Sequence, residues 1–364
     1  MIWIYVTETL LYLCFSLLIG SLVIQLVPSH LKPHLKISKR VLQVAILGIA
    51  FLSAAPVIRL ILFLYEDIGL LLTTQNVIGE FEVGQAWTVT VFISVFFYLF
   101  VSLVPVFKRK VFIGIALVFS FILLLAVGWA SHAASLTDWS GFVVHTLHFS
   151  AVTVWVGLLL VVSWFSTTAQ NWLSFLKWYT PVALSCLVIV IGSGIFIMTL
   201  AVDVTEYQDA WMMPYGQAIL LKHLLVLPVL LFAWINGVWM RRKLQRGEDI
   251  NPVPWSKAES VVLLLVFAAT AVLGQQEPPH SIEAYLKGSG ASDLFRYFYS
   301  GQIDPAMHLQ VDFTLLGSLF FGVAVVFIFL VLYCFKQKAP SFVSLLMSLF
   351  SVLALYVGLM MSIY

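Results

Sequence analysis

Three histidines lie close together in the sequence, where one long apolar segment ends and the next begins. They are His132, His145 and His148. A neutral imidazole ring binds Cu, Zn, Fe or Ni ions readily. Ionisable side chains are costly to keep at a membrane boundary, so histidines in this position indicate a function. The sequence therefore predicts a transition-metal site where these two segments meet.

The composition shows why the segments are assigned to a membrane. Charged residues make up 10% of the chain, hydrophobic residues 62%, and the mean hydropathy is +1.03. A helix needs about 20 apolar residues to cross a hydrocarbon core of ~30 Å. We expect an all-α, polytopic transmembrane bundle of about ten helices. The expected spans are 2–27, 41–65, 87–106, 111–131, 141–165, 180–202, 216–240, 257–275, 313–335 and 341–363.

Charge is distributed unevenly among the connections between these spans. Basic residues gather in alternate connections, at 32–40, 108–110, 177, 241–257 and 336–338. The intervening connections are mainly acidic, so the positive-inside rule predicts that both termini face the outer side of the cytoplasmic membrane. A basic inner surface is the ordinary topology signal, and we do not interpret it as nucleic-acid binding.

The simplest domain organisation is a single membrane domain, 1–364, whose first segment is a retained helix. Cys14, Cys186 and Cys334 fall at different depths of predicted helices, which favours buried thiols over a disulfide framework. The outer loops 66–86 and 276–311 are expected to form partial helices in the headgroup region.

Further ionisable residues are expected in the outer third of the membrane, at the same depth as the histidines. These residues are Glu8, Arg59, Lys222 and His223. Since the inner two-thirds contain no comparable group, this distribution predicts an outward-facing polar pocket. Lys222 is expected to pair with an acidic residue such as Glu8, or to reach the membrane interface, because a protonated amine repels a metal cation.

Helical spacing defines the expected metal site. Positions three and seven residues apart lie on one face of a helix, so His145, His148 and Trp155 form one stripe. His132, placed on the preceding helix across a loop of about ten residues, would supply a third nitrogen. His223 is a further candidate ligand. The alternative is that these imidazoles hydrogen-bond backbone carbonyls or lipid headgroups at the interface.

Methionines on the outer side are candidate ligands for soft Cu(I). Met198 lies near the outer end of the sixth span, although methionine is also common filler in apolar helices. Met212 and Met213 are adjacent in an outer loop with no expected core to fill, which favours a role in metal uptake. His280 and His308, in the last outer loop, are candidate capture ligands.

Four ordered motifs resemble the CopD family of copper-resistance and copper-uptake membrane proteins. The first two are Gly128-Trp-Ala-Ser-His-Ala-Ala and the His145-x-x-His to Trp155-Val-Gly157 helix. The others are Tyr215-Gly-Gln-Ala-Ile-Leu-Leu-Lys222 followed by Asn236, and Glu259 followed by Leu273-Gly-Gln-Gln-Glu-Pro-Pro279. The chain departs from the family pattern at Leu158 and Gly237, where the family has Gly and Arg.

The resemblance implies an eight-helix core that includes 85–280 and an extension, 281–364, with an outer loop and two further helices. It also implies copper transport across the cytoplasmic membrane, with import as the expected direction and an external copper-binding protein as a candidate donor. The sequence has no nucleotide-binding motif, so transport would draw on gradients or a partner.

Two other functions stay open. A membrane cytochrome would use two histidines to bind haem in the outer half of the bundle, with redox activity in that case only. A copper chaperone or assembly factor for a respiratory enzyme would need the outer site but no path through the membrane. Otherwise we expect a protein that is not an enzyme, with copper as Cu(I) or Cu(II) and the lipid bilayer as its partners.

Overall fold

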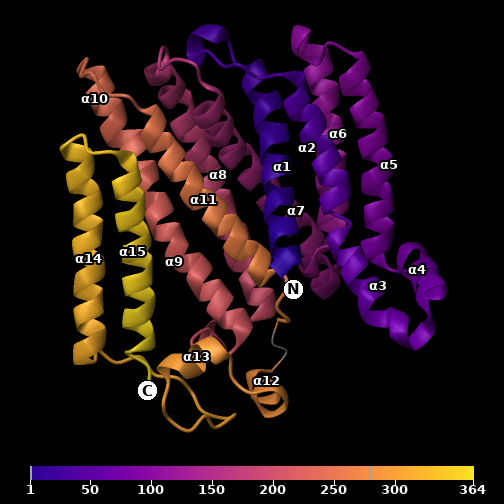
Figure 1. Cartoon of the computed structure of the whole chain (residues 1–364), viewed down its shortest axis with the longest axis vertical. Helices are drawn as coiled ribbons and strands as arrows, with labels where there is room; N and C mark the ends of the chain where they lie inside the picture. The colour runs from indigo at the N-terminus through magenta and orange to yellow at the C-terminus, as the bar shows by residue number, and fades with distance from the viewer. Residues whose placement is uncertain (1, 279–280) are drawn as a thin grey trace. The chain divides into compact units, whose positions relative to one another are not determined.

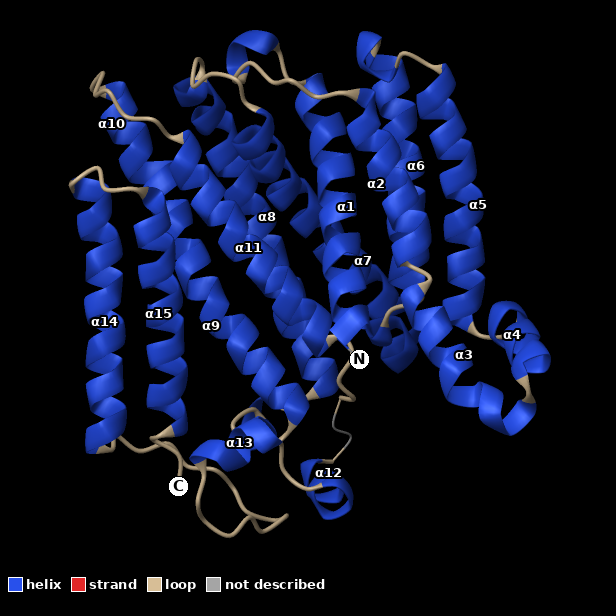
Figure 2. Ribbon diagram, viewed as in Figure 1, coloured by secondary structure: helices blue, strands red, loops and turns tan. Residues whose placement is uncertain are grey.

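The computed structural model describes residues 2–278 and 281–364, so Pro279 and His280 lie outside the described residues. The side chains of four residues near the start of one helix are also outside them: 132, 133, 136 and 138. The described residues form helices joined by loops, without a strand (Figures 1 and 2). Ten of these helical segments are long and apolar enough to cross a membrane, which confirms the expected number.

The chain divides into two compact units, 1–200 and 201–364, each described here by itself. Unit 1 contains seven long or medium helices, one short outer helix and two single 3₁₀ turns. Its elements are α1 (Ile2–Leu26), η1 (Ser29–Leu31), α2 (Lys39–Leu52), α3 (Ala55–Ile68), α4 (Leu70–Gly79), α5 (Glu82–Leu103), η2 (Val106–Lys108), α6 (Lys110–Trp129), α7 (His132–Phe165) and α8 (Trp172–Ala201).

Helix α7 is the most buried of the ten candidate membrane spans. Of its apolar 18-residue stretch, 72% is buried inside the protein, against 11% for α8. It packs along α1 through small residues. A Cβ atom added to Gly20 would overlap the main chain of Gly157, and one added to Gly157 would overlap the carbonyl of Ser16. In lipid, such close backbone approach gives van der Waals contact that larger side chains prevent. The α1 and α7 backbones therefore meet directly.

The second predicted span is two helices, α2 and α3, rather than one. Pro56 stands in the first turn of α3, where its missing N–H has no helical partner to lose. The Ser53 hydroxyl donates to the Ile49 carbonyl at 2.7 Å where α2 ends. The predicted partial helix in the loop 66–86 is confirmed by α4.

The expected loop between the fourth and fifth spans is wrong. Helix α6 ends at Trp129, and α7 begins at His132. The Ser131 side chain caps α7 by accepting a hydrogen bond from the Ala134 N–H, which satisfies one of the unpaired amides of its first turn. His132 therefore belongs to the same helix as His145 and His148, and not to the preceding one.

Unit 2 contains the remaining spans and two connections with short helices, 201–213 and 274–314. These connections are expected on the outer side and are together called the outer segment. Its elements are η3 (Val204–Glu206), η4 (Asp209–Met212), α9 (Pro214–Trp234), a π-helical segment η5 (Ile235–Met240), α10 (Arg241–Gln245), α11 (Val253–Leu273), α12 (Ile282–Ser289), α13 (Asp293–Phe298), α14 (Leu315–Lys336) and α15 (Ser341–Met360). Helices α12 and α13 confirm the predicted partial helices in the loop 276–311.

The last two helices form a hairpin, in which α14 and α15 lie side by side (Figure 1). A buried polar network joins α15 to α9. The Tyr356 hydroxyl donates to Gln217 Oε1, and Gln217 Nε2 donates to the Trp211 carbonyl, both at a distance of 2.5 Å. Since buried polar groups are costly without partners, this network fixes where α15 packs.

Candidate metal site

The imidazole of His148 is held by α8. Its Nδ1 lies 2.9 Å from the Ser193 hydroxyl, and the ring passes close to Gly194, where a Cβ atom would lie 3.4 Å from His148 Cε1. The Ser193 hydroxyl also donates to the Ile189 carbonyl, so it accepts from Nδ1–H of His148. This arrangement places the imidazole lone pair on Nε2. Histidines that bind metals commonly have their other nitrogen fixed in this way.

His145 lies one turn earlier on α7, at the level of a buried carboxyl group on α1. Phe149 of α7 contacts Tyr12 and Phe15 of α1 with ring centroids 5.6 and 5.2 Å apart. The Gly20–Gly157 contact lies further along both helices in the same direction, so α1 and α7 run parallel. Glu8 and His145 each precede the contacting glycines, Gly20 and Gly157, by twelve residues. The shared register sets both residues at one depth, and the Glu8 side chain is buried.

Two of the supporting residues lie on the helices that carry this site. Trp155 is buried on α7, and its carbonyl accepts a hydrogen bond from Tyr179 of α8 at 3.4 Å. Met198 is half-buried on α8, five residues after Ser193, which is about 7.5 Å along the helix. Because α8 returns antiparallel to α7, this thioether lies on the His145 side of His148.

His132 lies far from His145 and His148 along the axis of α7. Thirteen residues of α7 between His132 and His145 correspond to about 20 Å of helix. The side chain of His132 lies outside the described residues, so its role as a ligand stays a prediction. Arg59 is half-buried on α3. Its membership of the outer pocket also stays a prediction.

The remaining candidates belong to unit 2. His223 is exposed on α9, with Nδ1 2.7 Å from the Tyr207 hydroxyl, and Lys222 beside it is half-buried. The expected pairing of Lys222 with Glu8 stays a prediction.

The view of Met212 and Met213 as loop residues with no core to fill is wrong. Both side chains are 0% exposed. The Met212 carbonyl accepts a hydrogen bond from the Ser292 N–H at 2.8 Å, so the outer segment folds over this pair and supplies the missing core. A loop sequence alone gives no sign of such a cover. The two thioethers are core residues of unit 2 and are not presented at its surface.

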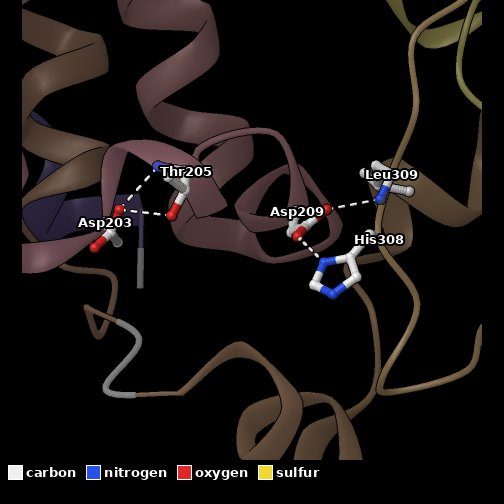
Figure 3. A network of polar contacts seen from close by, with 5 residues as sticks. All are labelled: Asp203, Thr205, Asp209, His308 and Leu309. Atoms are coloured by element: carbon white, nitrogen blue, oxygen red, sulfur yellow. Dashed lines mark hydrogen bonds and ion pairs between the residues drawn. The ribbon is translucent and has the colours of Figure 1, made fainter.

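His308 is exposed in the loop between α13 and α14. Its Nδ1 lies 2.7 Å from Asp209 Oδ2, and the Leu309 N–H donates to Asp209 Oδ1 at 2.6 Å (Figure 3). The hydrogen bond to the Asp209 carboxylate raises the pKa of His308 above its ordinary value, and the charge of Asp209 adds to the effect. In the segment before α9, the Thr205 hydroxyl and N–H lower the pKa of Asp203 by donating hydrogen bonds to its carboxylate.

The sequence patterns missed one buried polar contact, between Asn236 of the π-helical segment and Glu259 of α11. Asn236 Nδ2 donates to Glu259 Oε2 at 2.8 Å and to the Trp255 carbonyl at 3.2 Å. Sequence comparison with the family motifs marks both residues but gives no reason for them to meet.

The donor set is small. Among the described side chains, no three histidine, cysteine or carboxylate groups gather closely enough to hold a metal ion. The candidate donors of unit 1 are His145 and His148 on α7, with Glu8 and Met198 at a similar depth. Two imidazoles and a thioether are donors suited to copper.

The apolar spans and buried polar positions define a multi-pass helical membrane protein. The family model for copper resistance protein D matches residues 173–273, and the model for the copper resistance protein D-like N-terminal domain matches residues 2–142. The chain belongs to the copper resistance protein D family. No curated protein and no solved structure matches it. Its family marks it as a membrane protein concerned with copper resistance or uptake.

Proposed function

We propose that this protein carries copper inward across the cytoplasmic membrane, and that His145 and His148 of α7 bind the ion on the outer side. Family membership supports copper as the cargo. The observation that carries the site is the contact between His148 and Ser193, because it orients one imidazole as a ligand through Nε2.

Two imidazoles one turn apart, with Met198 at a similar depth, favour Cu(I) over harder cations. Glu8, at the level of His145, would favour a cation at this depth by its negative charge when ionised. His132, further out on the same helix, would meet the ion earlier. The inward direction is what the resemblance to the family implies, and acidic outer connections would concentrate cations on the external side.

The ligand assignment is tested by copper binding to the purified protein. His145→Ala combined with His148→Ala is expected to weaken binding by at least about 100-fold, because loss of an outer-shell partner alone costs about 10–100-fold. The matched control is His30→Ala combined with His34→Ala, which removes two histidines from another segment of unit 1. Equal copper stoichiometry in both variants would exclude the α7 site.

The same preparation separates the other two functions. A Soret band in the visible spectrum, with iron in the elemental analysis, would establish haem and overturn the copper proposal. Copper uptake into proteoliposomes by the wild type is expected, and its loss in the double α7 variant would exclude a chaperone without a transport path.

A further inference from the structure

Glu259 lies inside unit 2 and is only 3% exposed, yet the copper site does not use it. Its bond to Asn236 comes from the π-helical segment that follows α9. A π-helical turn widens a helix and leaves backbone and side chains displaced from their regular positions, and such turns are frequent at functional sites. A buried carboxyl group bonded to such a turn is therefore a candidate ligand-binding site.

The Asn236 amide has a fixed orientation. The Trp255 carbonyl only accepts hydrogen bonds, so the group that faces it at 3.2 Å is the amide NH₂. The same NH₂ faces Glu259. Asn236 is 7% exposed, and its Oδ1 is buried without a hydrogen-bond partner among the described residues. The residue that bonds the carboxyl group therefore carries an unsatisfied polar atom, which is costly unless it serves a purpose.

No basic side chain neutralises Glu259 among the residues described. Lys243 of α10 forms an ion pair with Glu248 at 3.3 Å and lies over the Phe335 ring. Lys257 precedes Glu259 by two residues, so it projects from nearly the opposite side of α11.

The titratable groups of the other packed elements are directed elsewhere. On α9, Lys222 and His223 precede Asn236 by thirteen or more residues, about 20 Å of helix. On α15, the Tyr356 hydroxyl is bonded to Gln217. A carboxylate in this setting bears a desolvation cost that no cationic side chain offsets.

The ligand that fits this site is a proton. Hard metal cations take six or more oxygen ligands, or keep several waters, whereas this site offers one carboxyl group and one amide oxygen. Soft copper prefers sulfur and imidazole donors. A proton needs a single carboxylate oxygen, and the Asn236 N–H still donates to the other oxygen of the protonated group.

We propose that Glu259 and Asn236 form a proton-binding site within the membrane, at which Glu259 takes up and releases a proton. Glu259 follows the start of α11 by six residues, or about 9 Å of helix, so the proton has a short route to the end of unit 2 that bears Arg241 and Arg242. The coupling of this proton to copper movement rests on the proposed function, whereas the titration of Glu259 does not.

Infrared difference spectroscopy of the purified wild type, between about pH 4 and pH 10, tests the titration directly. A carbonyl band of a buried carboxylic acid is expected, which downshifts in D₂O and is absent from Glu259→Gln. Asn236→Leu is expected to shift the same band to higher frequency, because the acid loses a hydrogen-bond partner. Glu283→Gln, which removes an exposed carboxyl group of α12, is the matched control and keeps the band.

The absence of any band that depends on Glu259 across this pH range would overturn the proposal. If Glu259→Gln does not fold, Glu259→Asp replaces it, and the band is then expected to shift rather than to disappear. Copper uptake into proteoliposomes tests the coupling. An imposed pH gradient is expected to change wild-type uptake several-fold and to leave Glu259→Gln unaffected. Equal sensitivity in both would overturn the coupling, whereas loss of copper binding by the wild type would defeat only the proposed function.

Discussion

The two units place their buried polar groups by different means. In unit 1, the α1 and α7 backbones meet at Gly20 and Gly157, and this contact sets Glu8 level with His145. In unit 2, side-chain hydrogen bonds do the positioning, as between Gln217 and Tyr356. Backbone contact tolerates no added volume, whereas a hydrogen-bonded pair tolerates changes of volume better than the loss of one partner.

The largest expected effect is that of Gly157→Ala in unit 1. The new methyl group would overlap the Ser16 carbonyl, so α1 and α7 must separate, at a cost of about 3 kcal/mol of folding free energy or more. Thermal unfolding in detergent measures it. Gly114→Ala on α6, where a Cβ atom meets open space, is the control and is expected to be neutral or stabilising by up to ~1 kcal/mol. Equal stability of the two variants would refute the backbone contact.

The next largest effect is expected in unit 2 from Gln217→Leu. This change leaves the Tyr356 hydroxyl and the Trp211 carbonyl without their partner and is expected to cost about 1–3 kcal/mol. The double variant with Tyr356→Phe should lose less than the sum of the single changes, because it removes the orphaned hydroxyl as well. Tyr333→Phe, on the exposed face of α14, is the control. Additive losses would show that the network is not coupled.

A smaller effect is expected at the His148 contact, where unit 1 does use a side-chain bond. Ser193→Ala frees the imidazole to adopt either tautomer and is expected to weaken copper binding about 10-fold. Ser193→Thr keeps a hydroxyl group at this position and should restore the affinity. If alanine and threonine behave alike, Ser193 does not position the ring.

The smallest effect concerns the outer loop of unit 2 and depends on pH. Since the pKa of His308 is raised above 6.5, its bond to Asp209 contributes fully below that value and is lost as the pH rises through the raised pKa. The amide hydrogen exchange rate of the loop around Leu309 should therefore rise with pH more steeply than the intrinsic exchange rate of unprotected amides. Asp209→Asn keeps an acceptor for the Leu309 N–H and should remove this pH dependence; if the dependence persists, another group controls the loop.

The ten spans were predictable because long apolar runs are dictated by the thickness of the bilayer. Short-range capping was harder to predict. Ser131 caps α7, which begins at His132, nine residues before the first residue of the expected span, and nothing in the hydropathy marks this position. Consequently the sequence placed His132 on the wrong helix, although it correctly indicated that these histidines cluster along the chain.

Contacts between distant residues were not accessible from spacing at all. The burial of Met212 beneath Ser292 joins residues far apart in sequence, and so does the bond from Asn236 to Glu259. Periodicity assigns a residue to a face of its own helix, but it does not say which partner that face meets. The sequence therefore yielded the donor types of the proposed metal site but not the serine that contacts His148.

The continuity of α7 restricts how any gating motion can work. A single helix of 34 residues carries His132, His145 and His148, so a tilt or a shift of that helix displaces their attachment points as one body. The axial spacing between the outermost histidine and the inner pair is then constant. Under the proposed function, exposure of the ion to the two sides of the membrane would have to change through movement of α8, because α1 meets α7 at direct backbone contacts.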